Sequence, residues 1–144
     1  MAVRVGINGF GRMGRLALRA AWDWPELDIV HVNEAKAGAA CAAHLLEYDT
    51  VHGRWNRGIE ANGKTIRIDD RSVEFSEHRT PGEVPWKMNE IEIVLECSGI
   101  VDGPATMVVD GKQLKVLAWY DNEVGYVHRM MELAKKVALT LAGN

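Results

Sequence analysis

Cysteine is scarce in this sequence, and long apolar runs and a targeting segment are lacking. The 144 residues include two cysteines, Cys41 and Cys97, too few for the disulfide framework of a small secreted protein. No apolar run approaches the length of a membrane-spanning helix, and no basic segment followed by an apolar one precedes the first strand pattern. We therefore expect a cytoplasmic protein without a membrane partner.

A surplus of positive charge is also lacking. The chain has 17 Lys and Arg residues against 20 Asp and Glu residues, and its formal net charge is −3 with His neutral. That charge is too small, and of the wrong sign, for a protein that binds nucleic acid by bulk electrostatics. Apolar residues make up 47% of the sequence, which suffices for one compact domain with its own core.

The first third of the chain follows a strand–helix–strand pattern. Residues 3–7 are β-rich and apolar, residues 13–23 contain helix formers, and residues 27–32 are apolar again. Trp24-Pro25 should end the helix, because a residue before proline avoids the α region. Such a unit begins a parallel sheet with right-handed crossovers.

The remaining elements are expected from periodicity and turn signals. They are a helix at 37–46, alternating strands between 59 and 75 with turns at Asn62-Gly63 and Asp70-Arg71, a strand at 91–96, a hairpin of 106–109 and 114–119 around 110–112, and an amphipathic helix from Asn122 to about Leu141.

The turn after the first strand is Gly9-Phe10-Gly11-Arg12-Met13-Gly14, and it matches the dinucleotide-binding fingerprint. Gly9 would permit the tight turn, Gly11 would let a pyrophosphate approach the backbone, and Gly14 would let the helix pack close to the strand. Free N–H groups at the helix N-terminus would face the phosphates. An ordinary tight turn could use the same glycines, but the strand before it and the helix and strand after it favour the nucleotide site.

The fingerprint also requires an acidic residue at the end of the second strand. Glu34 lies 20 residues after Gly14, where a carboxylate can accept both ribose hydroxyls and repel a 2′-phosphate. This favours NAD over NADP, although Lys36 could offset part of the repulsion. The alternative is a solvated loop acid. The sequence thus predicts an α/β fold with a Rossmann-type, mostly parallel sheet, flanking helices, an inserted antiparallel hairpin region and a long C-terminal helix.

Five segments resemble the glyceraldehyde-3-phosphate dehydrogenase family, and together they reach from one end of the chain to the other. They are VGINGFGRMGR at 5–15, VNE at 32–34 with Glu34 where Asp is usual, HLLEYDTVHG at 44–53, ECSG at 96–99 and WYDNEVGY at 119–126. The resemblance implies a glycolytic oxidoreductase that oxidises an aldehyde to an acyl phosphate with NAD as hydride acceptor. Trp22-Asp23-Trp24-Pro25 also resembles a branch linked to arsenate detoxification.

The resemblance further implies a set of cofactor-binding residues. They are Asn8, Gly9, Phe10, Gly11, Arg12, Met13 and Gly14 around the pyrophosphate, Asn33 and Glu34 at the adenosine ribose, Arg79 against the adenine, Cys97, Ser98 and Gly99 at the floor of the crevice, Asn122 at the nicotinamide carboxamide and Tyr126 near its ring. Asn122 would also cap the last helix, and the two roles are compatible.

The family's catalytic groups have no counterpart in this sequence. It contains no Ser-Cys-Thr-Thr-Asn segment for the nucleophile, and the strand that carries the histidine base is absent. The resemblance changes near residues 99–101, which gives a dinucleotide-binding domain at 1–99, residual strands of the catalytic domain at 100–121 and a C-terminal helix at 122–144. We therefore expect a chain that binds NAD without dehydrogenase turnover, and we assign no catalytic residue and no metal site.

Two other functions stay open. Cys97 follows a strand at the ligand-binding edge of the sheet and could serve an enzyme of altered chemistry, with His44, His52 or His128 brought near by folding. We nevertheless expect it, like Cys41, to be a small core residue. The other alternative is an interaction module that binds nucleotide or RNA, against which the acidic balance counts.

The hairpin at 106–119 predicts self-association. Its apolar strands belong to a larger sheet in the family and would leave unpaired backbone groups along at least one edge. It can fold back onto its own domain or pair with the same hairpin of a second copy. We expect a homo-oligomer, most simply a dimer.

Overall fold

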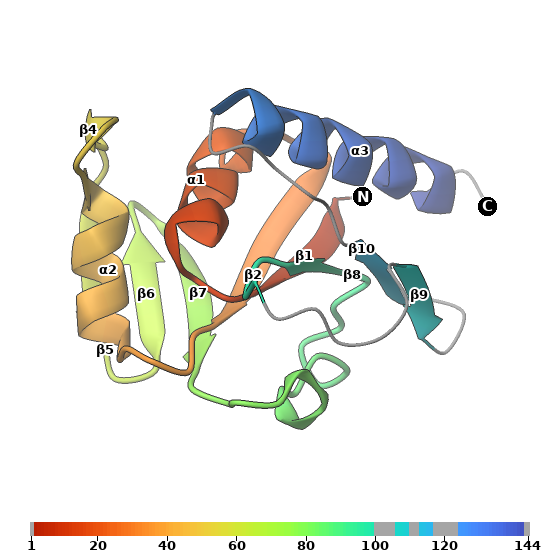
Figure 1. Ribbon diagram of the computed structural model, residues 1–144, viewed down its shortest axis with the longest axis horizontal. Helices are drawn as coiled ribbons and strands as arrows, with labels where there is room; N and C mark the ends of the chain where they lie inside the picture. The colour runs from red at the N-terminus through yellow and green to blue at the C-terminus, as the bar shows by residue number, and fades with distance from the viewer. Residues whose placement is uncertain (1, 100–105, 110–112, 117–123, 143–144) are drawn as a thin grey trace.

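The computed structural model describes residues 2–99, 106–109, 113–116 and 124–142 (Figure 1). Its main sheet has eight strands in the order β5-β6-β7-β2-β1-β8-β10-β9. The strands are β1 (Val3–Asn8), β2 (Leu27–Asn33), β5 (Ile59–Asn62), β6 (Thr65–Ile68), β7 (Arg71–Ser76), β8 (Ile93–Glu96), β9 (Thr106–Val109) and β10 (Gln113–Val116). The other elements are α1 (Arg12–Ala21), α2 (Ala39–Glu47), the pair β3 (Tyr48–Asp49) and β4 (Gly53–Arg54), the 3₁₀ turn η1 (Pro81–Glu83) and α3 (Val124–Ala142).

Strand order reverses at β1, and this fixes where a ligand can bind. The centre of the sheet, β7-β2-β1-β8-β10, is parallel, whereas β5, β6 and β9 pair antiparallel with their neighbours. The chain passes from β1 to β2 and on to β7 in one direction, while β8 lies on the other side of β1. A crevice forms at the carboxyl ends of the strands where the order reverses. The predicted Rossmann-type fold is confirmed.

One face of the sheet packs against α1, α2 and α3 and forms the main core (Figure 1). Val5 and Ile7 point to this face from β1, and they meet Leu18 of α1, Leu46 of α2 and Met131 of α3. The exposed fraction of each of these side chains is 1% or less. The alternation of a strand and the three-to-four spacing of a helix place these residues together.

The segment from 77 to 92 packs on the other face of the sheet. Val84, Trp86 and Ile91 form a second, smaller core there. Trp86 reaches the sheet at Gly6, where a Cβ would lie 2.7 Å from the indole ring. Gly6 therefore gives the indole room to pack against β1, although the sequence signals no special role for this glycine.

The element predictions are confirmed with shifts of a few residues at the ends. The helix expected at 13–23 is Arg12–Ala21, that at 37–46 is Ala39–Glu47, the strand at 91–96 is Ile93–Glu96 and the last helix is described over Val124–Ala142. The strands expected between 59 and 75 are β5, β6 and β7. No helix among the described residues is long and apolar enough to cross a membrane.

The prediction that Cys41 is a core residue is wrong. Cys41 is exposed on α2. The buried positions of this helix are Ala39, Ala42, Ala43 and Leu46, which follow helical spacing and leave Cys41 facing away. An alanine-rich helix gives little contrast between its faces, so its sequence does not show which one is buried.

The hairpin joins the sheet of its own domain. β10 pairs in parallel with β8, so that Leu114 lies beside Ile93 and Val116 beside Leu95, and β9 pairs antiparallel with β10. Of the two outcomes expected for this hairpin, the fold-back is therefore seen for β10. Residues 117–121 and Asn122, with its expected helix cap, lie outside the described residues.

Replacing Gly14 should destabilise the fold, because an added Cβ would overlap the carbonyl oxygen of Gly9. We expect Gly14→Ala to lower the free energy of unfolding by about 1–3 kcal/mol, the usual cost of overpacking. The matched control is Gly125→Ala, a helical glycine that is exposed and whose added Cβ would meet nothing within 4 Å. The control should be neutral or up to about 1 kcal/mol more stable, because alanine favours helix. Urea unfolding of both variants is the measurement, and equal stabilities would contradict the close packing at Gly14.

Candidate cofactor cleft

A cleft of about 250 Å³ lies at the carboxyl ends of β1, β2 and β8. Its lining comes from the Gly-rich turn, the two segments after β2 and β7, and the end of β8. The lining residues are Asn8, Gly9, Gly11, Asn33, Glu34, Ala35, Lys36, His78, Arg79, Pro81, Glu96, Cys97 and Ser98. The crevice expected from the strand order is therefore present.

The structure brings eight of the proposed site residues into this lining: Asn8, Gly9, Gly11, Asn33, Glu34, Arg79, Cys97 and Ser98. Phe10 and Met13 are buried in the main core instead, so only their backbone could meet a ligand. Gly99 is exposed just beyond β8, and Asn122 lies outside the described residues. Tyr126 is half-buried on α3 and packs against the main core.

Several lining residues were not among those proposed from the sequence. His78 and Pro81 flank Arg79, and Glu96 ends β8. The sequence does contain a signal for Glu96, because a polar residue that ends a parallel strand lies at the ligand-binding edge. No such rule points to His78 or Pro81, since the cleft reaches them only through the packing of the 77–92 segment.

The three fingerprint glycines differ in what surrounds them. Gly9 has φ of +89°, and a Cβ there would overlap the backbone of Ser98. Gly11 lines the cleft, and a Cβ there would meet no protein atom within 4 Å. The space beside Gly11 is thus left to a ligand, while Gly9 and Gly14 are required by the protein's own packing.

The N-terminus of α1 is suited to an anion. Its N-cap is Gly11, which makes no side-chain hydrogen bond to the helix, and the first turn contains no acidic residue. The first N–H groups of a helix have no intrahelical partner, and the helix dipole favours negative charge near them. A pyrophosphate next to Gly11 would therefore meet backbone N–H groups that are not hydrogen-bonded to a capping side chain.

Glu34 is fixed at the rim of the cleft. Its Oε2 accepts a hydrogen bond from the Phe10 N–H at 3.0 Å, and its Oε1 accepts one from the Lys36 N–H at 2.9 Å. Glu34 is half-buried, and both of its carboxylate oxygens are bound to backbone N–H groups. Each carboxylate oxygen has a second lone pair, so Glu34 can still accept a hydroxyl.

The side chain of Asn33 forms the floor of the cleft. Its Oδ1 accepts hydrogen bonds from the His78 N–H and the Ser76 Oγ–H, and its Nδ2 donates to the His78 carbonyl and to Asn8 Oδ1, all between 2.8 and 2.9 Å. Asn8 Nδ2 then donates to Glu96 Oε2 at 2.6 Å. Glu96 Oε1 accepts from the N–H and the Oγ–H of Ser98. These bonds tie together the ends of the four strands β7, β2, β1 and β8.

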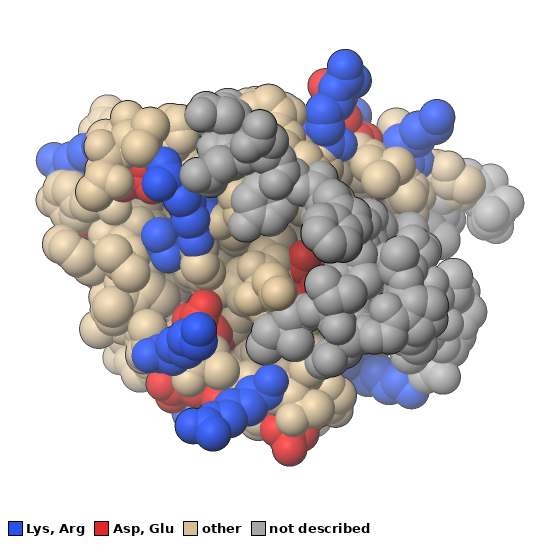
Figure 2. Space-filling model, in the orientation of Figure 1, with Lys and Arg blue, Asp and Glu red and all other residues tan. Residues whose placement is uncertain are grey.

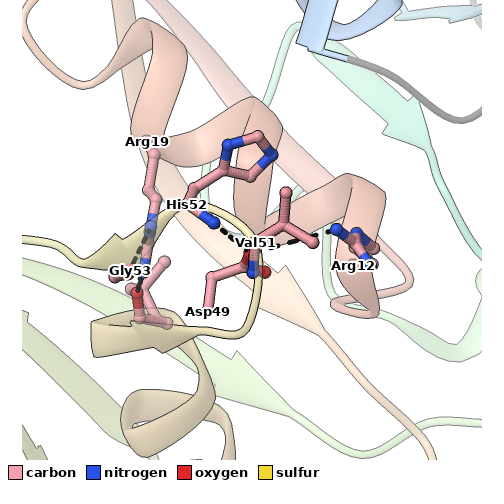
Figure 3. Close-up of polar contacts among 7 residues, drawn as sticks. Arg12, Arg19, Asp49, Val51, His52 and Gly53 are labelled. Atoms are coloured by element: carbon pink, nitrogen blue, oxygen red, sulfur yellow. Dashed lines mark hydrogen bonds and ion pairs between the residues drawn. The ribbon is translucent and has the colours of Figure 1, made fainter.

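The segment at 44–53 docks against α1 (Figure 3). Asp49 accepts hydrogen bonds from the backbone N–H groups of Val51 and His52 and lies 4.0 Å from the Arg12 guanidinium. The bond from His52 is the main reason that the pKa of Asp49 is below its usual value. Arg19 donates to the carbonyls of Leu46 and Gly53. This segment therefore holds α1 in place and does not line the cleft.

The surroundings of Cys97 disfavour the reactive thiolate form of its side chain. It is half-buried in the cleft lining, and burial, with the Glu96 carboxylate beside it, raises the pKa of its thiol to about 12. A reactive thiolate needs a lowered pKa. No group of three His, Cys, Asp or Glu side chains within the described part of the chain could hold a metal ion.

Figure 2 shows Lys and Arg side chains interspersed with Asp and Glu on the face of the molecule that it displays. Among the described residues, several arginines are paired with carboxylates, such as Arg57 with Asp23 and Asp69, and Arg67 with Glu60. This mixture of charges on the displayed face does not favour the RNA-binding alternative.

Thiol alkylation should separate the two cysteines. In a Cys41→Ser variant, we expect Cys97 to react with iodoacetamide roughly a hundredfold more slowly than an ordinary thiol at pH 7.5, because its thiolate is scarce. Its rate should keep rising with pH up to the limit of protein stability, since its pKa is about 12. The control is Cys97→Ser, which retains the exposed Cys41. Equal rates in the two variants would contradict the buried environment of Cys97.

Comparison with known proteins identifies the family. A family model described as glyceraldehyde 3-phosphate dehydrogenase, NAD binding domain, matches residues 3–104. Glyceraldehyde-3-phosphate dehydrogenase 3 of Nostoc sp. is 61% identical over 107 residues, which cover 74% of this chain and 32% of the relative. Glyceraldehyde-3-phosphate dehydrogenase 1 of Bacillus subtilis is 42% identical over 99 residues, which cover 69% of this chain and 29% of the relative. The chain thus aligns with less than a third of the length of these relatives, and it belongs to the glyceraldehyde-3-phosphate dehydrogenase family, whose NAD-binding domain it contains.

Proposed function

We propose that this chain binds NAD(H) in the cleft between β1, β2 and β8 and does not by itself oxidise an aldehyde. The observation that carries the proposal is the open space at Gly11, next to an uncapped helix N-terminus, in a cleft that also holds the Glu34 carboxylate bound to the Phe10 N–H. These are the parts that a pyrophosphate and a ribose require. The residues present therefore fit the cofactor of the family's domain.

Each part of the cofactor has proposed partners. The N–H groups that follow Gly11 would hold the pyrophosphate, and Glu34 would accept the ribose hydroxyls. Arg79 and Pro81 would lie beside the adenine. Ser98 and Gly99 would form the floor towards the nicotinamide, with Asn122 at the carboxamide and Tyr126 near the ring. Bound NAD would supply a hydride acceptor, and these residues would orient it.

The second part of the proposal is that this chain does not by itself oxidise an aldehyde. The sequence contains no Ser-Cys-Thr-Thr-Asn segment. Cys97 does not replace the missing nucleophile, because its raised pKa leaves almost no thiolate at neutral pH. Covalent catalysis needs an activated nucleophile with a base in reach, and the raised pKa of Cys97 argues against such a nucleophile in the cleft.

Calorimetric titration with NAD tests the proposal. We expect the parent chain to bind NAD and Gly11→Val to lose binding while it stays folded, because the new side chain would occupy the space of the pyrophosphate. The matched control is Gly82→Val, where an added Cβ also meets nothing within 4 Å but which does not line the cleft. Unchanged NAD affinity in a folded Gly11→Val variant would contradict the assigned site.

Two further measurements on the parent chain, NADP binding and an assay for NADH formation, test the rest of the proposal. NADP should bind more weakly than NAD, because the Glu34 carboxylate repels a 2′-phosphate. With glyceraldehyde 3-phosphate and inorganic phosphate present, NADH should not form above a blank. Phosphate-dependent NADH formation would refute the proposed lack of turnover and leave the proposed binding intact.

We also propose self-association through the outer edge of the sheet. β9 stands at the end of the strand order, and β10 is its one partner among the described strands. A sheet edge with unpaired backbone groups is a site for pairing with another strand, and a second copy of the same hairpin gives a closed dimer. Light scattering should show a dimer at high protein concentration, and a strict monomer would contradict this assembly.

A further inference from the structure

The wall of the cleft that carries His78, Arg79 and Pro81 is held in place from outside the cleft. Two contacts join its 77–92 segment to β2, and a third contact lies within the segment itself. The Trp86 indole meets the buried His31 ring edge to face at 5.3 Å between ring centroids, and its Nε1–H donates to the Pro81 carbonyl at 2.9 Å. The side chain of Asn89 lies 2.7 Å from His31 Nδ1. All three contacts depend on His31 or on the indole packed against it.

A bulge in β2 turns His31 towards this segment. The register between β1 and β2 shifts between Val5 and Gly6, so that Val5 pairs with Ile29 and Gly6 with His31. Such a bulge inserts one extra residue and re-aims the side chain that follows. Gly6, opposite His31, has no Cβ, and the Trp86 ring takes that space. His31 is thereby enclosed, with 2% of its surface exposed.

The backbone of His78 determines which nitrogen of His31 carries a proton. Asn33 Oδ1 must accept from the His78 N–H, and Asn33 Nδ2 must donate to the His78 carbonyl. Ser76 can then only donate its hydroxyl proton to Asn33 Oδ1, so Ser76 Oγ must accept from His31 Nε2–H at 2.8 Å.

The neutral His31 ring then accepts at Nδ1, from Asn89 Nδ2. These side chains form a series of hydrogen bonds in which each residue donates to the next. The series runs from Asn89 through His31, Ser76, Asn33 and Asn8 to the carboxylate of Glu96 in the cleft.

The charged groups near His31 are compatible with a neutral ring that carries its proton on Nε2. The Glu74 carboxylate lies 3.6 Å from Nδ1, and Asn89 Nδ2 also donates to it at 2.7 Å. Burial lowers the pKa of the His31 imidazole, Glu74 partly offsets this effect, and His78 adds a small lowering contribution. His31 is therefore neutral at pH 7.5, when its Nδ1 can accept.

We propose that His31, in its Nε2–H tautomer, is a positioning residue for the adenosine half of the cofactor. It touches no part of the cleft itself. It holds the wall of Arg79 and Pro81 through Asn89 and Trp86, and it holds the floor through Ser76 and Asn33. This inference rests on the proposed binding of NAD, and it adds a residue that the family's motifs do not contain.

The affinities for NAD and for AMP measure this role. Removing the ring in His31→Leu deletes one hydrogen bond of Ser76 and one of Asn89, so we expect both affinities to fall by about tenfold, the same factor for each. His31→Gln retains an N–H in place of Nε2–H and should stay within about threefold of the parent. Ser76→Ala should cause a similar loss of affinity. The double variant His31→Leu with Ser76→Ala should lose less affinity than the sum of the two single variants, because both substitutions interrupt the same series of hydrogen bonds.

A packing variant separates positioning from general destabilisation. Ile91→Val removes a methylene from the same small core, where Ile91 is 3% exposed, but breaks none of these hydrogen bonds. It should lower the stability by about 0.5–1.5 kcal/mol and leave the affinities unchanged. A loss of affinity as large in Ile91→Val as in His31→Leu would overturn the proposal.

The ¹⁵N chemical shifts of the His31 ring give a reading that does not depend on any ligand. At pH 7.5 the parent should show a protonated Nε2 and an unprotonated Nδ1, and the opposite tautomer or an imidazolium would overturn the proposal. Parent-like affinity in a folded His31→Leu variant would overturn it as well. A parent chain that binds neither NAD nor AMP would instead refute the proposed function, and the positioning role with it.

Discussion

The side chain of Asn33 holds the cofactor cleft together. It lies at the end of β2, is 3% exposed, and uses both lone pairs of its oxygen and both protons of its nitrogen in hydrogen bonds within the protein. Two of these bonds go to the backbone of His78 and fix the position of the chain after β7. The third and fourth reach Ser76 and Asn8, and so connect three neighbouring strands. Because a buried amide that loses one partner costs about 1–3 kcal/mol, the floor of the cleft has one favourable arrangement.

The same floor holds the Glu96 carboxylate in the cleft. Glu96 accepts hydrogen bonds from Asn8 and from the backbone and hydroxyl of Ser98. Charge-assisted hydrogen bonds of this kind are the stronger ones, and they leave Glu96 with little tendency to move. Its charge also opposes ionisation of Cys97, the next residue along the chain. Burial is the main cause of the raised pKa of the Cys97 thiol, and the Glu96 carboxylate that these hydrogen bonds hold in place adds to it.

The glycines at and behind this cleft have three different roles. Gly9 and Gly14 are needed because neighbouring backbone leaves no room for a Cβ, whereas Gly11 is surrounded by open space that a ligand can fill. Gly6 serves the packing of Trp86 on the other side of β1. The cleft thus depends on close packing at both faces of one strand, which places the Gly-rich turn on one side and the wall of Arg79 and Pro81 on the other.

The sequence alone is enough to place the strand–helix–strand unit, the glycines of the turn at Gly9 and Gly14 and the acid at Glu34, because each depends on local periodicity and on a spacing of about 20 residues within one unit. It also indicated the long C-terminal helix, whose apolar residues recur at helical spacing. Tertiary packing settled that His78 and Pro81 line the cleft, that Cys41 is exposed and that β10 lies beside β8. The physical reason is that these features depend on segments far apart in the chain, such as Asn33 and His78, which a β-bulge and the close packing of Trp86 on Gly6 bring together. No periodicity or turn signal in the sequence records such a contact.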